Sequence, residues 1–299
     1  MKKVASVLAL SFIFGCLALA PAQEKPAQDQ GQAAHKPPKI LVITREFVKP
    51  GRTGAVHEKT ESAFVQAFAS QKWPTHYLAM DSLSGRPRSL FLTGYGSFED
   101  MEKDARAVQK NAVLSAALDK AGYSDGDLLS EMDGGTFAYR EDLSLHIADG
   151  VDIPHMRYFE IARFKIKPGH DKDWEQLVKL VMSGYEKTPD VVWACYEVVY
   201  GNQGDGTFLF FTPRKTAAEV DQAFARGKDF EKAMGDEGMK QMRDLSASTI
   251  ENSETNLFML NPRMSYADES FVKADPDFWT IKAAAPAPKK KGNPEAAKK

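Results

Sequence analysis

Apolar and polar positions follow the same order twice along the chain. An extended run at 40–48 ends at Lys49-Pro50-Gly51, and a second at 157–166 ends at Lys167-Pro168-Gly169. Proline and glycine end a strand and turn the chain, so both runs are predicted to be strands. A helix is predicted after each one. In the second half, apolar residues recur at helical spacing, namely at Trp174, Leu177, Val178, Val181 and Tyr185.

The remaining elements of the two halves also correspond. Two extended runs joined by a turn-rich segment come next, at 73–81 and 89–95 in the first half, and at 191–200 and 207–212 in the second. A second helical region then opens, at Ser97 and at Thr216, and a last strand is predicted around 136–140 and 256–260. The resulting order, β-α-β-β-α-β, is that of the ferredoxin-like unit.

The two halves match at a constant separation. Ile43 and Ile161, Arg45 and Arg163, and Gly51 and Gly169 are each 118 residues apart, and Leu90-Phe91-Leu92 is aligned with Phe208-Leu209-Phe210 at the same separation. The sequence therefore predicts an α+β fold of two tandem ferredoxin-like units, 40–150 and 151–265. Both first strands are apolar on both faces, so the sheets are expected to pack against each other within the chain.

A first strand that ends in Val/Ile-Lys-Pro-Gly and leads into an amphipathic helix resembles the dimeric α/β-barrel superfamily. That superfamily includes the antibiotic-biosynthesis monooxygenase, EthD-like and NIPSNAP-like families, and the resemblance covers residues 40–262. It implies two sheets closed into a barrel with helices outside, here formed within one chain. It also implies cofactor-independent monooxygenase or isomerase activity as one possible function.

Haem chemistry is a further implication of the resemblance, because chlorite-dismutase-like proteins also use tandem ferredoxin-like units. Their proximal histidine lies on a helix of the second unit. The helices predicted in the second unit of this chain carry no histidine beyond His170, at the start of one of them. We therefore expect no cofactor.

The ends of the chain differ from its body. Residues 1–22 have a basic start, an apolar stretch and Ala20-Pro21-Ala22, which is the pattern of a cleaved signal peptide. Cys16 offers a less favoured alternative, acylation as a lipoprotein. Residues 23–39 are predicted to be a disordered leader, and 266–299 an extension with a disordered basic tail. The predicted location is periplasmic or secreted, with no transmembrane segment after cleavage.

The charge of the chain argues against one class of partner, and its cysteine content argues against a disulfide. Without the signal peptide and the tail at 283–299, the chain has 32 basic and 40 acidic residues, which argues against nucleic acid as a partner. Cleavage also removes Cys16 and leaves Cys195 alone, so no disulfide within the chain is expected.

Candidate site residues come from matched or strand positions. Arg45 and Arg163 occupy the same place in the two first strands, and they are interpreted as structural ion pairs or as anchors for a carboxylate or phenolate. His76, placed in the second strand, is the best acid–base candidate. Glu197 is the other, and it is expected to pair with Arg163 or Lys165. The aromatic candidates for a ligand pocket are Tyr77, Tyr95, Trp193 and Tyr196.

No metal site is predicted, because the histidines show none of the local spacings of metal motifs. Such a site would have to be assembled from distant residues. The sequence thus favours an exported protein that binds a small apolar or aromatic ligand in a cleft between sheet and helices. The alternatives are a cofactor-independent monooxygenase or isomerase, and a haem-binding protein.

Overall fold

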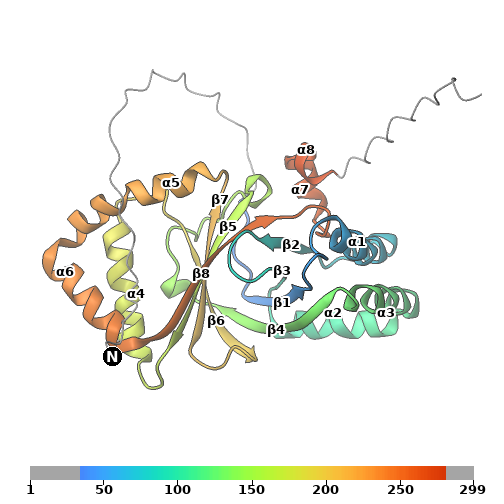
Figure 1. The fold of residues 1–299 in the computed structure, drawn as a ribbon, viewed down its shortest axis with the longest axis horizontal. Coiled ribbons are helices and arrows are strands. Elements are labelled where there is room, and N and C mark those ends of the chain that lie inside the picture. Colours follow the sequence, from blue (N-terminus) through green and yellow to red (C-terminus); the bar gives the residue numbers. More distant parts are fainter. Residues whose placement is uncertain (1–33, 281–299) are drawn as a thin grey trace, which may run out of the picture.

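The chain closes eight strands into one barrel in the order β1-β3-β2-β8-β5-β7-β6-β4 (Figure 1). The computed structural model describes residues 34–280. Every pair of neighbouring strands is antiparallel. The strands are β1 (Ile40–Val48), β2 (Tyr77–Ser82), β3 (Ser89–Tyr95), β4 (Leu129–Tyr139), β5 (Tyr158–Ile166), β6 (Ala194–Gly201), β7 (Thr207–Arg214) and β8 (Ile250–Leu260).

Helices lie outside the barrel in two groups, which Figure 1 shows on opposite sides of it. The first half contributes α1 (Ala55–Ser70), α2 (Phe98–Lys110) and α3 (Ala112–Gly126). The second half contributes α4 (Asp171–Tyr185), α5 (Ala218–Ala225) and α6 (Gly227–Thr249). The halves join where β2 pairs with β8 and β4 with β6. The mixed helix-and-sheet fold and the closed barrel agree with the predicted α+β class.

Alternating side chains give each strand one face inside the barrel and one towards the helices. In β1, Leu41, Ile43 and Arg45 face the interior, whereas Glu46 faces helix α1. The interior is the largest apolar core of the described residues. Burial of each large side chain stabilises the fold by about 1.5–3 kcal/mol. Its most buried aromatic members are Phe137 and Phe258, both 2% exposed.

The Lys-Pro-Gly turns end β1 and β5 as predicted. Gly51 and Gly169 have φ angles of 76° and 83°, in the left-handed region that glycine adopts without a steric penalty. Each turn leads directly towards the first helix of its half.

Several predicted boundaries are wrong. β2 begins at Tyr77 rather than at residue 73, so His76 lies in the preceding loop. The last strands begin earlier, at Leu129 and Ile250, and each second helical region contains two helices. The downstream alignment of the halves is also shifted by one residue. Leu90 lies opposite Arg45, and its counterpart opposite Arg163 is Leu209.

The segments that flank the two halves cover one end of the barrel. Residues 34–39 belong to the predicted disordered leader, yet His35 forms a β-bridge with Val151. At the other terminus, α7 (Glu269–Ala274) and α8 (Pro276–Trp279) place Phe271 and Trp279 in the barrel core.

Other predictions concern residues outside 34–280. The signal peptide at 1–22 with Cys16, the leader at 23–33 and the tail from 281 onward lie outside the described residues. Within 34–280, no helix combines the length and the apolar character needed to cross a membrane.

Candidate functional site

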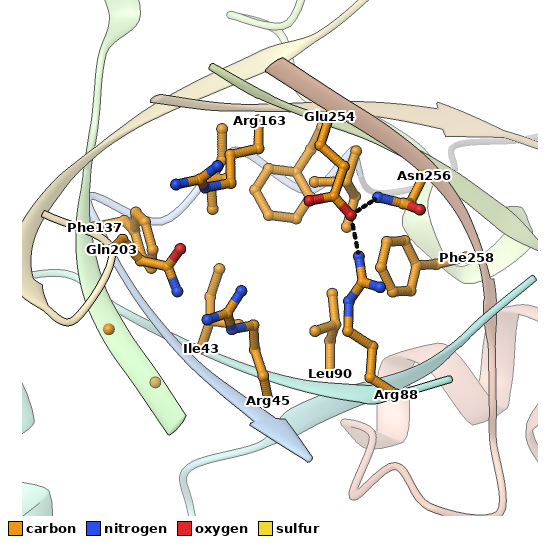
Figure 2. Close-up of a pocket in the computed structure, with 15 residues that line it drawn as sticks. Ile43, Arg45, Arg88, Leu90, Phe137, Arg163, Gln203, Glu254, Asn256 and Phe258 are labelled. Atoms are coloured by element: carbon orange, nitrogen blue, oxygen red, sulfur yellow. Dashed lines mark hydrogen bonds and ion pairs between the residues drawn. The ribbon is translucent and has the colours of Figure 1, made fainter. Parts of the chain in front are cut away.

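The barrel holds a cavity at each end, and Phe211 lines both. At one end, which we call the arginine end, β1 and β5 bring Arg45 and Arg163 to the same pocket of about 50 Å³ (Figure 2). Arg88, immediately before β3, is the third arginine there. Sequence matching predicted the first two as a pair but missed Arg88, because its matched position in the second half is not an arginine.

Carboxylates neutralise two of these three arginines. Arg45 makes two hydrogen bonds of 2.5 Å to Asp133 on β4, so its interpretation as a structural ion pair fits the geometry. Arg88 donates to Glu254 at 3.3 Å. Arg163 has only a 3.4 Å hydrogen bond to Asn252 and no ion pair among residues 34–280. One uncompensated positive charge therefore faces this pocket, which suits an anion no larger than a carboxylate.

The hairpin loop between β6 and β7 supplies a further group that sequence reasoning treated as a plain turn. Gln203 lies beside Arg45 in the wall of the pocket (Figure 2). With its amide oxygen turned towards Arg45, it accepts hydrogen bonds from that guanidinium.

At the opposite end, which we call the apolar end, the cavity has a volume of about 280 Å³. Its wall combines barrel strands with residues 34–38, the segment between the halves and α7. The side chains that make it apolar are Leu41, Leu78, Met80, Leu92, Ile147, Phe159 and Phe211. A cavity of this size and composition has room for a one- or two-ring molecule, since an engineered apolar cavity of about 150 Å³ binds benzene.

Two histidines lie in the wall of the apolar end. His76 Nε2 is 3.4 Å from Asp268 Oδ2, and the His76 ring stacks on Tyr266 with centroids 4.6 Å apart. His35 contacts the Phe271 ring edge-on. Within the described chain, Nδ1 of each histidine is buried without a hydrogen-bond partner. Burial lowers the pKa of His35 below its ordinary value and so favours the neutral ring.

Tyr77 and Tyr196 also belong to this wall. The Tyr196 hydroxyl donates to the Pro38 carbonyl, and burial raises its pKa above the ordinary value. The Tyr77 ring instead packs on Phe68 of helix α1 and on Phe91.

The other predicted residues lie elsewhere. Tyr95 donates to Asp104 of α2, and Trp193 donates to the Leu143 carbonyl beside α4. Glu197 pairs with Arg140 at 2.7 Å, not with Arg163 or Lys165. That prediction is wrong because Glu197 faces away from the barrel interior, whereas Arg163 faces into it.

The ligand cleft was expected between a sheet and its own helices. In the second half, apolar side chains fill that space. The two cavities described above lie inside the barrel instead. In the first half, a third and more polar cavity of about 330 Å³ does lie between the sheet and its helices, beside Glu46 and Asp125.

The described residues form the closed eight-stranded barrel with helices outside that the resemblance to the dimeric α/β-barrel superfamily implied (Figure 1). Similar solved structures include a monooxygenase-type, an anthrone oxidase-like and a chlorite dismutase-like protein. No family model and no curated protein matches the sequence.

Three of the similar structures show how low the sequence identity and the structural similarity are. An anthrone oxidase-like protein shares 10% identity with a TM-score of 0.46, over 74% of this chain and 91% of that one. A protein from Lactobacillus acidophilus, provisionally named a monooxygenase, shares 5% with a TM-score of 0.44, over 74% and 93%. Chlorite dismutase from Candidatus Nitrospira defluvii shares 10% with a TM-score of 0.42, over 79% and 95%. At these values the likeness carries no argument about activity or ligand.

Proposed function

We propose that the protein binds a small aromatic or apolar molecule in the apolar end of its barrel. The observation that carries the proposal is the 280 Å³ cavity itself, with mostly apolar walls and two histidines. Ligand sites typically combine such a surface with a few polar groups that orient the ligand. His35 and His76 in the cavity wall provide such polar groups. The best-matched ligand class is therefore a one- or two-ring compound with a hydroxyl or carbonyl group.

Calorimetric titration with 2-naphthol tests this proposal, because that compound has two rings and one hydroxyl. We expect saturable binding with one site per chain. Leu92→Trp fills the cavity, since Leu92 lies in its wall, and should weaken binding at least tenfold. Leu83→Trp is the matched control, because Leu83 is 51% exposed and outside the cavity. Equal binding by both folded variants, or no binding by the wild-type chain, would refute the proposal.

A second candidate function is proton transfer on a ligand in the same cavity. His76 favours it, because Asp268 lies 3.4 Å from one ring nitrogen and can orient the imidazole while the other nitrogen has no partner. A histidine held in this way is a common general base. A cofactor-independent isomerase needs little more than such a base and a positioned substrate.

Isomerisation of a β,γ-unsaturated cyclohexenone, followed by the ultraviolet absorbance of the conjugated product, tests this candidate. His76→Gln should abolish turnover, and because the glutamine amide can still hydrogen-bond to a ligand hydroxyl, it should weaken 2-naphthol binding less than Leu92→Trp does. If wild-type protein and His76→Gln are equally inactive, the function is binding alone.

The residues do not fit a haem in the second half. Helices α4, α5 and α6 contain no histidine, and His170, just before α4, is hydrogen-bonded to Asp173. The space between sheet and helices there is filled by Trp174, Phe164 and Phe208. We therefore derive no reaction through haem.

Export and duplication complete the proposal. The pattern of residues 1–22 supports cleavage after Ala22 and a periplasmic or secreted location, which N-terminal sequencing of exported protein would test. Duplication of one ferredoxin-like unit is supported by the equal element order of the halves. It is also supported by the matched turns at Gly51 and Gly169.

A further inference from the structure

Four ionisable side chains meet on the outer face of the first half's sheet, away from both barrel cavities. They are Glu46 of β1, His57 and Glu61 of α1, and Asp125 near the end of α3. All four are buried, and one ligand atom from each lies within 4.8 Å of the others. We call them the carboxylate–histidine cluster.

The distances in the cluster are those of atoms arranged around one point. From His57 Nε2, a Glu46 oxygen is at 3.0 Å, an Asp125 oxygen at 3.5 Å and a Glu61 oxygen at 3.9 Å. Ligands held about 2.1 Å from a tetrahedral metal ion are about 3.4 Å apart. Small movements of side chains would bring all four to that geometry.

Neighbouring groups fix the orientation of the imidazole. The Ser89 hydroxyl donates to Asp81, which leaves its oxygen free to accept from His57 Nδ1 at 3.4 Å. With the proton on Nδ1, the lone pair of Nε2 faces the carboxylates. Metal-binding histidines are commonly held by such a second hydrogen bond. Thr60 likewise donates to Asp125 at 2.6 Å and holds that carboxylate in place.

Without a cation, the cluster is electrostatically unbalanced. The Glu61 side chain is 4% exposed, and within the described chain its Oε1 has no hydrogen-bond partner. Glu46 and Asp125 bring two further carboxylates to the same buried place. A buried carboxylate in such surroundings must either hold a proton or meet a positive charge.

We propose that the carboxylate–histidine cluster binds one divalent first-row transition-metal cation, such as Zn²⁺ or Mn²⁺. Three carboxylates and one imidazole are a donor set that these ions accept, and the imidazole disfavours Ca²⁺ and Mg²⁺. The third cavity gives the ion a path, since Glu46 and Asp125 line it together with Met132, which is 63% exposed.

The site departs from the sequence expectation of no metal. That expectation rested on local spacing, and it left open only a site assembled from distant residues. The cluster is of that kind, because its members span positions 46 to 125. A binding site here does not depend on a ligand in the barrel.

Calorimetric titration of the full chain with ZnCl₂ and with MnCl₂, after treatment with a chelator, tests the site. We expect one ion per chain, with binding weakened at least tenfold in Glu61→Gln. Glu58→Gln is the matched control, because Glu58 lies on the same helix but contacts Asn261 and Arg263 instead. The control should bind like the wild-type chain.

Spectroscopy of the Co²⁺-loaded chain provides a second readout. Visible bands of a four- or five-coordinate ion should appear in the wild-type chain and in Glu58→Gln, and be lost in folded Glu61→Gln. The proposal is overturned if the wild-type chain binds neither ion stoichiometrically, in which case His57 carries a proton and forms a buried ion pair. It is also overturned if Glu61→Gln and Glu58→Gln bind alike, which would place the ion elsewhere.

Discussion

The two halves close the space between sheet and helices in different ways. In the first half, Glu46 lies opposite Ser89 and faces His57 of α1. At the matched position of the second half, Phe164 lies opposite Phe208, and both contact Trp174 of α4. One interface is thus built from carboxylates and a histidine, and the other from aromatic rings.

The second half shows that the fold does not require buried charge in this layer. Replacing buried ionic groups by well-packed apolar ones is often neutral or stabilising. The polar interface of the first half therefore stabilises the chain less than the aromatic interface does, unless a cation neutralises it. This difference supports the proposed cation site in the first half, at a position where the second half has aromatic side chains.

Trp174→Ala has the largest expected effect. Trp174 is 2% exposed and contacts three phenylalanine rings, so truncation should lower the free energy of unfolding by about 3–5 kcal/mol. Urea unfolding measures the loss, and Trp174→Phe should recover most of it. A loss below about 1 kcal/mol would show that the aromatic interface is not what holds the second half together.

Glu61→Met tests the other side of the comparison. With a chelator present, the substitution removes Glu61 Oε1, a buried oxygen that has no hydrogen-bond partner among residues 34–280, so the free energy of unfolding should rise by about 1–3 kcal/mol. The same urea experiment measures it, with Glu58→Met as a control that changes little. A fall instead would mean that the metal-free fold uses Glu61, and the contrast between the halves would fail.

The matched arginines should differ on a smaller scale. Arg45→Leu breaks a partly buried ion pair and leaves Asp133 uncompensated, at a cost of about 1–2 kcal/mol. Arg163→Leu should cost less than about 0.5 kcal/mol, because Arg163 has one long hydrogen bond and no ion pair within residues 34–280. Thermal unfolding of the two variants side by side checks the order, and equal losses would contradict it.

The smallest expected effect on stability is the pH dependence that Asp133 contributes. Burial alone would raise the pKa of Asp133, but hydrogen bonds from Arg45 and Asn202 outweigh it and hold the pKa below its ordinary value. A depressed pKa adds stability above about pH 4, and that contribution disappears as the pH falls through the folded-state pKa. The stability difference between wild type and Asp133→Asn should therefore shrink from pH 7 to pH 3. If the stability difference stayed the same between pH 7 and pH 3, the Arg45–Asp133 ion pair would not contribute to stability.

The sequence predicted what depends on local pattern. Proline, glycine and the apolar periodicity predicted the Lys-Pro-Gly turns and the element order. The same pattern showed that Arg45 and Arg163 occupy matched positions in the two halves. The alignment of Leu90 failed by one residue because 90–92 and 208–210 are apolar on both faces, so alternation does not identify the inward face.

The sites were less predictable because they join distant residues. His35 lies in a segment of low complexity, and only its bridge to Val151 brings it to the cavity wall. The carboxylate–histidine cluster links a strand to two helices, and the only local spacing that could have pointed to it is the i,i+4 pair of His57 and Glu61 on α1. His76, the acid–base candidate, lies in the wall of the cavity at the apolar end, but it precedes β2 instead of lying in it.

Anomalous X-ray diffraction from crystals of the full chain grown with ZnCl₂ tests the contrast between the halves most directly. We predict one strong buried peak, about 2.0–2.2 Å from His57 Nε2 and from oxygens of Glu46, Glu61 and Asp125. No buried peak should appear at Phe164 and Trp174. The account is contradicted if zinc is found only on the surface while Glu61 keeps a proton and hydrogen-bonds to a neighbouring carboxylate.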